Sequence, residues 1–217
     1  MLPSLFSCVL VAAYFTGSIP TGFLVAKSKG IDIRTVGSGN IGATNAFRVL
    51  GRSAGIFVLA VDALKGFVAV QLFPWLGARV AVGDFESLGP SGEWLRLLAG
   101  LGAILGHNFP CWLKFKGGKG IATSAGVMLG LVPLGLLIAL AVWLIVFWAS
   151  RYVSLASVCA AFALPFAVWL TRPKANLLIA ISAVVSALAI YKHRSNIRRL
   201  WQGTEHRFGS KNKPASL

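Results

Sequence analysis

Acidic side chains are scarce in this sequence, in which six Asp and Glu residues stand against 21 Lys and Arg residues. Charged residues of both signs make up only 12% of the chain, whereas a soluble domain contains about 25%. Hydrophobic residues make up 56%, and apolar runs of about 20 residues recur through the sequence. A soluble globule of 217 residues could not bury so much apolar surface. The composition therefore excludes a soluble fold and predicts an all-α integral membrane protein.

Cysteine and histidine are also rare, with three residues of each. The cysteines are scattered without the spacing of a metal or redox motif. The histidines have no cluster of carboxylates near them in the sequence. We therefore expect neither a metal site nor a cofactor. The six residues are Cys8, Cys111, Cys159, His107, His193 and His206.

The net charge of +15 would suggest nucleic-acid binding in a soluble protein. Here the basic residues lie almost entirely in the loops between apolar runs. The positive-inside rule explains most of them without a ligand, so we expect no nucleic-acid partner. The rule does not explain the Lys and Arg residues that stand among glycines.

Seven membrane helices can be placed along the chain. Residues 1–26 carry no charge and Lys27 follows the apolar run, whereas a secretory signal carries its charge before that run. We therefore interpret the segment as a retained first helix with its N-terminus outside. A single helix over 121–150 would measure about 45 Å, longer than a hydrocarbon core of about 30 Å, and Gly130 and Pro133 supply a break. The predicted helices, of which the fourth is short, span 4–25, 54–75, 94–108, 121–131, 133–150, 154–171 and 174–192.

The distribution of basic residues supports this topology. Most of them fall in the inner loops that seven spans would create, while the outer loops hold Arg79 and Arg172, balanced by three acidic residues. The C-terminus is then cytoplasmic. We expect a single membrane-embedded domain over 1–217, with 207–217 as a loosely ordered basic tail. The inner loops are 26–53, 109–120, 151–153 and 193–217.

The first inner loop is rich in glycine and polar residues. Glycine permits positive φ, so that successive backbone N–H groups can turn toward one point and hold an anion. A short helix over 43–50 would add the dipole of its N-terminus, and Thr44 and Arg48 would share one face of it. An ordinary turn would need only the glycines, so the polar residues favour a functional loop. Its candidate residues are Gly37, Ser38, Gly39, Asn40, Gly42, Thr44, Asn45 and Arg48.

The second inner loop carries a Gly-Gly-Lys-Gly segment just before the fourth helix. Lys119 in this segment is predicted to bind a phosphate, although the segment lacks the glycine spacing and the Ser or Thr of a nucleotide P-loop. Attraction to anionic lipid heads is enough to explain Lys114 and Lys116. For His107, at the start of the loop region, a structural and a functional role are equally supported.

A third group of polar residues lies at the inner end of the last helix. His193 and Asn196 are three residues apart and share a helical face. Ser154 and Ser157 lie at the same depth, although helix capping alone would explain Ser154.

Asp62 and Lys65 lie inside the second helix, three residues apart. Charged residues within the membrane are functional candidates by default. A mutual ion pair would satisfy both side chains, and we favour this structural explanation.

These motifs, in this order, resemble those of the bacterial acyl-phosphate:glycerol-3-phosphate acyltransferase family (PlsY). The resemblance spans residues 18–205 and implies seven helices, an external N-terminus, and a site facing the cytoplasm from the bacterial cytoplasmic (inner) membrane. The matching strings are Gly-Ser-Gly-Asn-Ile-Gly-Ala-Thr-Asn from Gly37 with Arg48, Gly-His-Asn-Phe-Pro from Gly106 through Lys-Gly-Gly-Lys-Gly, the Ser154/Ser157 segment, and His-Arg-Ser-Asn-Ile from His193.

The resemblance implies transfer of a fatty acyl group from acyl phosphate to the sn-1 hydroxyl of glycerol 3-phosphate. The products are lysophosphatidic acid and phosphate, in the first acylation of phospholipid synthesis. The family differs from acyltransferases with a His-x4-Asp pair, which this chain lacks because positions 112 and 198 are Trp and Arg. An acyl phosphate is already activated, so the protein mainly has to neutralise and align two phosphorylated substrates. The expected partners are these substrates and the lipid bilayer, with the chain as a monomer.

The resemblance also implies roles for individual residues. The proton of the acceptor hydroxyl has two candidate bases, His193 and a phosphate oxygen of the donor. Ser38, Thr44 and Asn45 would hold the acyl phosphate head, while the remaining catalytic residues would grip glycerol 3-phosphate. The catalytic residues are Ser38, Arg48, Lys119, His193 and Asn196, and the further substrate-binding residues are Gly37, Gly39, Asn40, Gly42, Thr44, Asn45, His107, Gly118, Ser154 and Ser157.

Two other functions are compatible with basic loops at a membrane surface. An anion transporter or channel would need polar residues across the bilayer, and the predicted spans offer little beyond Asp62 and Lys65. A non-catalytic protein that binds lipid heads or a partner would need the basic loops but not the glycine geometry.

Overall fold

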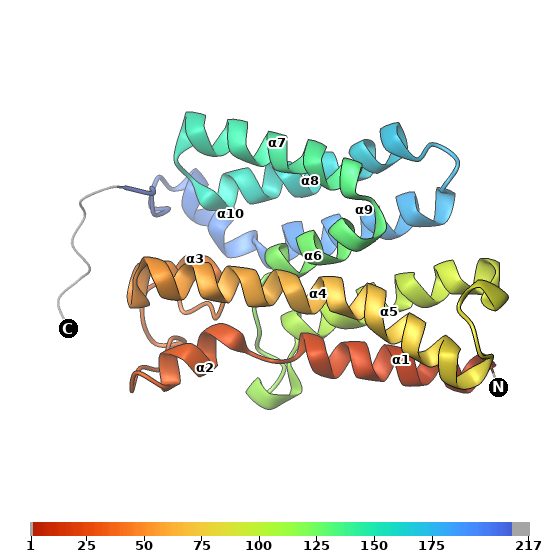
Figure 1. Ribbon diagram of the computed structural model, residues 1–217. Coiled ribbons are helices and arrows are strands. Elements are labelled where there is room, and N and C mark those ends of the chain that lie inside the picture. The colour runs from red at the N-terminus through yellow and green to blue at the C-terminus, as the bar shows by residue number, and fades with distance from the viewer. Residues whose placement is uncertain (1, 210–217) are drawn as a thin grey trace. The chain divides into compact units, whose positions relative to one another are not determined.

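The computed structural model describes residues 2–209, so most of the predicted basic tail, from 210 onward, lies outside the described residues. Within 2–209 every regular element is a helix, which confirms the all-α class (Figure 1). The chain divides into two compact units, Met1–Leu131 and Val132–Leu217, and each is described by itself.

The first unit is built on three long helices that run side by side, α1, α4 and α5 (Figure 1). The short helix α3 and the predicted short helix α6 both pack against α4, as does α2. The elements are α1 (Leu2–Gly17), α2 (Thr21–Lys27), α3 (Ala43–Leu50), α4 (Arg52–Ala81), the 3₁₀ turn η1 (Glu86–Leu88), α5 (Pro90–Asn108), the 3₁₀ turn η2 (Cys111–Leu113) and α6 (Ile121–Leu131).

Small residues allow these helices to approach closely. A side chain at Gly17 would overlap the backbone of α5, and one at Gly106 would overlap the backbone of α1. Gly66 and Gly126 stand in the same relation between α4 and α6. Close approach at small residues is a principal source of helix association in lipid, where the surroundings are as apolar as the side chains.

Three helices of the first unit differ from their predicted bounds, and the one predicted over 94–108 begins four residues earlier, at Pro90. The helix predicted over 4–25 is interrupted between Gly17 and Thr21, next to Pro20, which has no N–H to continue the ladder. The helix predicted over 54–75 extends to Ala81 and contains Pro74. The break predicted between 121 and 150 is confirmed, because α6 ends at Leu131 and the next helix begins at Pro133.

The second unit contains α7 (Pro133–Ser150), α8 (Val153–Thr171), α9 (Asn176–Lys192) and α10 (Arg194–Trp201). Helix α8 packs between α7 and α9, and α10 contacts both α8 and α9. Arg151 adopts a left-handed conformation, with φ of 62°, in the tight turn between α7 and α8. The sequence did not predict α10, which follows α9 after a bend of 55°.

Four stretches among the described residues are long and apolar enough to cross a membrane, and α9 with α10 makes a fifth if the bent pair is one span. These stretches are Leu2–Lys27, Arg52–Ala81, Pro133–Ser150 and Val153–Thr171. Seven crossings and the sides on which the termini lie stay predictions.

Candidate active site

The first loop, between α2 and α3, is folded around the side chain of Asn45. The Asn45 Nδ2 group donates to the carbonyls of Ile33, at 3.2 Å, and Val36, at 3.1 Å. Its Oδ1 accepts from the backbone N–H of Ser38 at 2.9 Å. The side chain is 1% exposed. These bonds give Asn45 a role in shaping the loop, which the sequence did not predict.

Two of the three loop glycines expected to have positive φ do so, whereas Gly42 is extended, with φ of −79°, as the residue that precedes α3. Gly37 has φ of 60° and Gly39 has φ of 67°, in the left-handed region where a side chain is strained. At Gly37 a Cβ would also overlap Oδ1 of Asn45. The loop therefore requires glycine at this position both for its backbone and for the space that Asn45 occupies.

Several of the loop's own amides are used within the loop. Gly39 N–H donates to the carbonyl of Val36 at 3.0 Å, and Gly42 N–H donates to Asn40 Oδ1 at 2.9 Å. Ser38 N–H donates to the buried amide described above. An anion site here would therefore depend on the start of α3, whose first amides precede the helix's own hydrogen-bond ladder.

Helix α3 presents two of the predicted residues on its exposed face. Thr44 and Arg48 are both exposed, whereas Asn45 and Ala46 on the opposite face are buried. The helix packs against α4, so the short segment that carries Arg48 is held on a long helix. Ser38, in the loop that precedes α3, is exposed as well.

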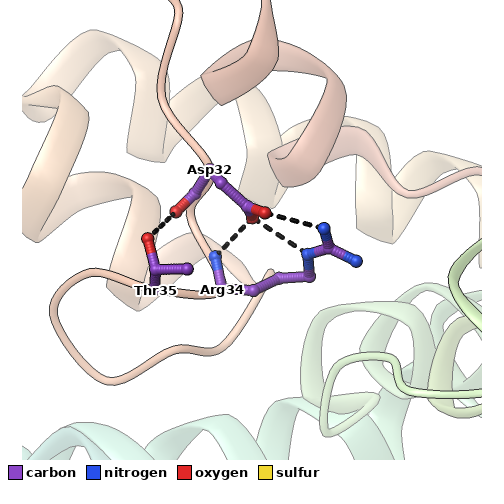
Figure 2. A network of polar contacts seen from close by, with 3 residues as sticks. All are labelled: Asp32, Arg34 and Thr35. Atoms are coloured by element: carbon purple, nitrogen blue, oxygen red, sulfur yellow. Dashed lines mark hydrogen bonds and ion pairs between the residues drawn. The ribbon is translucent and has the colours of Figure 1, made fainter.

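The arginine of the loop itself, Arg34, is bound to Asp32 (Figure 2). Its Nε and Nη2 donate to the two oxygens of Asp32 at 2.9 and 2.7 Å, and its guanidinium lies 4.8 Å from the ring of Phe23. Figure 2 also shows Thr35, whose hydroxyl donates to the backbone carbonyl of Asp32 at 3.0 Å. Hydrogen bonds from the side chain and backbone of Arg34 lower the pKa of Asp32 to about 2. Arg34 is thus engaged within the loop by Asp32 and Phe23.

The Gly-Gly-Lys-Gly segment folds back against the end of α5. Gly117 N–H donates to the carbonyl of Asn108 at 3.2 Å, and Gly118 N–H donates to the carbonyl of His107 at 3.1 Å. Lys119 comes directly after these two bonds and is half-buried. The backbone position of this lysine is therefore determined by α5.

A buried group of charged side chains lies next to this segment. Lys65 Nζ is 2.8 Å from Asp62 Oδ1, which is the ion pair that their spacing predicted. His107 Nδ1 lies 3.6 Å from the same oxygen, and all three side chains are at most 5% exposed. The contact between Asp62 and His107 was not predicted, because it joins residues far apart in the sequence.

In the second unit, Glu205 joins two of the predicted site residues. Its Oε1 accepts from Ser154 Oγ at 2.9 Å and from Asn196 Nδ2 at 2.8 Å, and its Oε2 accepts from Arg199 Nε at 2.7 Å. Burial alone would raise the pKa of Glu205, but these hydrogen bonds outweigh it and lower the pKa below its ordinary range. The sequence did not single out Glu205, although an acidic residue in a basic segment is a usable signal.

His193 lies at the bend between α9 and α10 and is buried. Its Nδ1 is 2.7 Å from the carbonyl of Ala189. A carbonyl only accepts hydrogen bonds, so Nδ1 carries the proton in the neutral ring and Nε2 is the basic nitrogen.

Ser157 does not share the hydrogen-bond partner of Ser154, which is Glu205. Its hydroxyl donates to the carbonyl of Val153 at 2.8 Å and accepts from Trp143 Nε1 at 3.2 Å. The structure therefore places Ser157 in the contact between α7 and α8, outside the group around Glu205.

Comparison with known proteins gives one consistent result. The family model described as glycerol-3-phosphate acyltransferase matches residues 7–203. A glycerol-3-phosphate acyltransferase of Geotalea daltonii is 50% identical over 200 residues, which cover 92% of this chain and 96% of the relative. One from Geobacter sulfurreducens is 48% identical over 196 residues, covering 90% and 94%.

Two crystal structures of PlsY (YgiH), an integral membrane glycerol 3-phosphate acyltransferase, are also similar. The glycerol 3-phosphate form has a TM-score of 0.82 and 41% identity, with 94% of this chain and 96% of that chain covered. The lysophosphatidic acid form has a TM-score of 0.79 and 40% identity, with 94% and 95% covered.

Proposed function

The chain belongs to the glycerol-3-phosphate acyltransferase family of integral membrane proteins, and we propose that it transfers a fatty acyl group from acyl phosphate to the sn-1 hydroxyl of glycerol 3-phosphate. The products are lysophosphatidic acid and phosphate. The observation that carries the proposal is that PlsY is known in a glycerol 3-phosphate form and a lysophosphatidic acid form, two molecules that differ by one acyl group. Family membership favours an enzyme over a transporter or a lipid-head-binding protein.

The proposed reaction is a direct displacement at the acyl carbonyl. The sn-1 oxygen forms a bond to the carbonyl carbon, the bond from that carbon to the phosphate oxygen breaks, and the phosphate leaves with the bonding electrons. Because the mixed anhydride is already activated, the enzyme needs no nucleophile of its own. Its main tasks are to neutralise phosphate charge and to hold the hydroxyl against the carbonyl.

The first unit offers residues suited to phosphate. Arg48 on the exposed face of α3 and Lys119 on the backbone-anchored segment are the proposed cations. Ser38, Thr44 and the first amides of α3 are proposed to hold the acyl phosphate head. Gly37, Gly39, Asn40, Gly42 and Asn45 would act mainly by shaping the loop, as their internal hydrogen bonds and backbone angles support.

The second unit offers residues suited to a hydroxyl. The contact of Asn196 Nδ2 with Glu205 orients the amide, whose Oδ1 is proposed to bind glycerol 3-phosphate. His193 is a candidate base through Nε2, and the donor phosphate is the alternative. A His193→Ala protein with undiminished turnover and an unchanged pH profile would exclude the histidine from that role. Ser154 supports Asn196 through the shared carboxylate.

The proposed setting is the bacterial cytoplasmic membrane, with seven crossings, an external N-terminus and the active site on the cytoplasmic side. The basic residues of the loop after α2, the segment before α6 and the stretch after α9 support this orientation by the positive-inside rule. A single membrane-embedded domain acting as a monomer, without metal or cofactor, completes the proposal.

A comparison of donors tests the proposed substrate. Purified protein in lipid would be incubated with labelled glycerol 3-phosphate and one of three donors, acyl phosphate, acyl-CoA or acyl carrier protein, carrying the same chain. We expect lysophosphatidic acid from acyl phosphate alone. Activity with either thioester and none with acyl phosphate would overturn the donor assignment while leaving an acyltransferase.

A further inference from the structure

One carboxylate oxygen buried in the first unit contacts three side chains, one from its own helix and two from other elements. Asp62 Oδ1 accepts from Thr21 Oγ1 at 3.1 Å and lies 2.8 Å from Lys65 Nζ. It also lies 3.6 Å from His107 Nδ1, within the range of an ion pair with a protonated imidazole. Lys65 Nζ in turn donates to the carbonyl of Ile19 at 2.9 Å. The Asp62 network thus connects α4 with the α1–α2 break and with the end of α5.

An ion pair within α4 would not need these additional contacts. Lys65 and Asp62 are three residues apart on one helix and satisfy each other's charge. Thr21 and His107 come from elements that are far away in the sequence, and both are buried against the same oxygen. The network therefore does more than balance the charge of α4, because it places the carboxylate of Asp62 3.6 Å from the His107 ring.

The His107 ring is in direct contact with the Gly-Gly-Lys-Gly segment. A Cβ built on Gly118 would overlap the imidazole at Nε2, the edge of the ring away from Nδ1. The backbone of Gly118 is bonded to the carbonyl of the same histidine at 3.1 Å. Asp62 contacts one edge of the ring, and the backbone that precedes Lys119 lies against the other edge.

From this arrangement we infer that Asp62 is a positioning residue for Lys119 and acts through the imidazole of His107. The inference rests on the proposed function, in which Lys119 binds a substrate phosphate. Asp62 itself touches no substrate. A displacement of about 1 Å in a binding group can lower an enzyme's rate by about 100-fold, so a small shift of the segment is enough to matter.

A double-mutant cycle tests the inference. The test variant is Asp62→Asn/Lys65→Met, which removes both charges and leaves no lone buried ion. We expect kcat/KM for glycerol 3-phosphate to fall by about 10- to 100-fold, which is the scale expected for a misplaced binding group. Most of this loss should come from a higher KM. In the Lys119→Ala background the same pair of substitutions should cost less than about two-fold, because residues that act through one another are not additive. Equal fold-losses in both backgrounds would overturn the inference.

Gln71→Leu is the matched control. Gln71 is also a polar residue of α4. Its Nε2 donates to the carbonyl of Gly130 on α6 at 3.1 Å, and its Oε1 accepts from Arg96 Nη2 on α5 at 2.7 Å. Gly130 and Arg96 lie ten or more residues along their helices from Gly120 and His107. We expect Gln71→Leu to lower the thermal midpoint. Its fold-effect on kcat/KM should be the same in the wild-type and in the Lys119→Ala background. If Gln71→Leu were coupled to Lys119→Ala as strongly as Asp62→Asn/Lys65→Met is, the effect of the Asp62 variant would be explained by a general loss of stability.

Hydrogen exchange provides a measurement that does not need catalysis. The amides of Gly117 and Gly118 are bonded to α5, and we expect them to exchange at least 10-fold faster in Asp62→Asn/Lys65→Met than in the wild type and in Gln71→Leu. Unchanged exchange would overturn the positioning role even if the wild-type protein transferred no acyl group. Failure of acyl transfer alone would instead refute the proposed function.

Discussion

Asn196 Nδ2 donates to Glu205 Oε1 over 2.8 Å, so a carboxylate nine residues farther along the chain holds the amide of a predicted site residue. Ser154 and Arg199 bind the same carboxylate. The carboxylate therefore ties α8 to α10 within the second unit and sets the direction in which the Asn196 amide points. Its loss should affect both the stability of this unit and the activity.

Replacement of Glu205 by Gln keeps the shape of the side chain and removes its charge. We expect the free energy of unfolding to fall by about 1.5–3 kcal/mol, the contribution of a hydrogen bond to a charged group. Thermal unfolding in detergent measures the change. Glu86→Gln, at an exposed position on η1, is the control and should change stability by no more than about 0.5 kcal/mol. Equal midpoints for the two variants would contradict the structural role of Glu205.

The stabilisation by Glu205 should depend on pH in a defined direction. Its pKa lies below the ordinary value of 4.5, because the hydrogen bonds from its three partners outweigh its burial. A carboxyl with a lowered folded pKa stabilises the fold above its unfolded pKa and loses that contribution as the pH falls through the folded value. The difference in thermal midpoint between wild type and Glu205→Gln should be constant above pH 4.5 and shrink below it. A difference that grows in acid would refute this assignment.

Replacement of Asn45 by Ala should open the first loop. The change leaves the buried carbonyl of Ile33, the half-buried carbonyl of Val36 and the amide of Ser38 without this partner, and an unsatisfied buried group costs about 1–3 kcal/mol. We expect a lower thermal midpoint together with a strong loss of acyl transfer. Asn40→Ala removes a single hydrogen bond, to Gly42, and should have the smaller effect on both. The reverse order of effects would show that the loop does not depend on Asn45.

Two glycines with similar backbone angles allow the effect of backbone strain to be distinguished from the effect of steric overlap with Asn45. Gly37 and Gly30 have φ of 60° and 72°, but a Cβ overlaps Asn45 only at Gly37, and nothing lies within 4 Å at Gly30. Alanine in the left-handed region costs about 1–2 kcal/mol at either position. We expect Gly37→Ala to lose most of its activity in an acyl-transfer assay and Gly30→Ala to retain it. Comparable activity in the two variants would mean that the Asn45 contact is dispensable.

The predictions from sequence that succeeded rest on local patterns. Hydrophobic length and the Gly130–Pro133 interval predicted the break before α7, and i,i+3 spacing predicted the ion pair of Asp62 with Lys65. Each of these depends on residues that are neighbours in the chain, so the physical constraint is visible in a short window.

The features that were missed depend on contacts between distant residues. Glu205 meets Ser154 across 51 positions, and Asp62 meets His107 across 45. The hydrophobic periodicity of the sequence gives no information about a contact between residues so far apart. The inward-facing amide of Asn45 was missed for a related reason, because a polar residue in a Gly-rich loop gives no sign of whether it faces a ligand or the loop itself. Helix α10 is charged and short, so it lacks the apolar run that located the other helices.

An isotope experiment tests whether the acyl group passes directly from acyl phosphate to the sn-1 hydroxyl of glycerol 3-phosphate. Purified protein in lipid would be given acyl phosphate and glycerol 3-phosphate carrying ¹⁸O in its sn-1 hydroxyl. Direct transfer predicts lysophosphatidic acid that retains the ¹⁸O in its ester, with one unlabelled phosphate released for each ester formed. Phosphate release without labelled lysophosphatidic acid would contradict it.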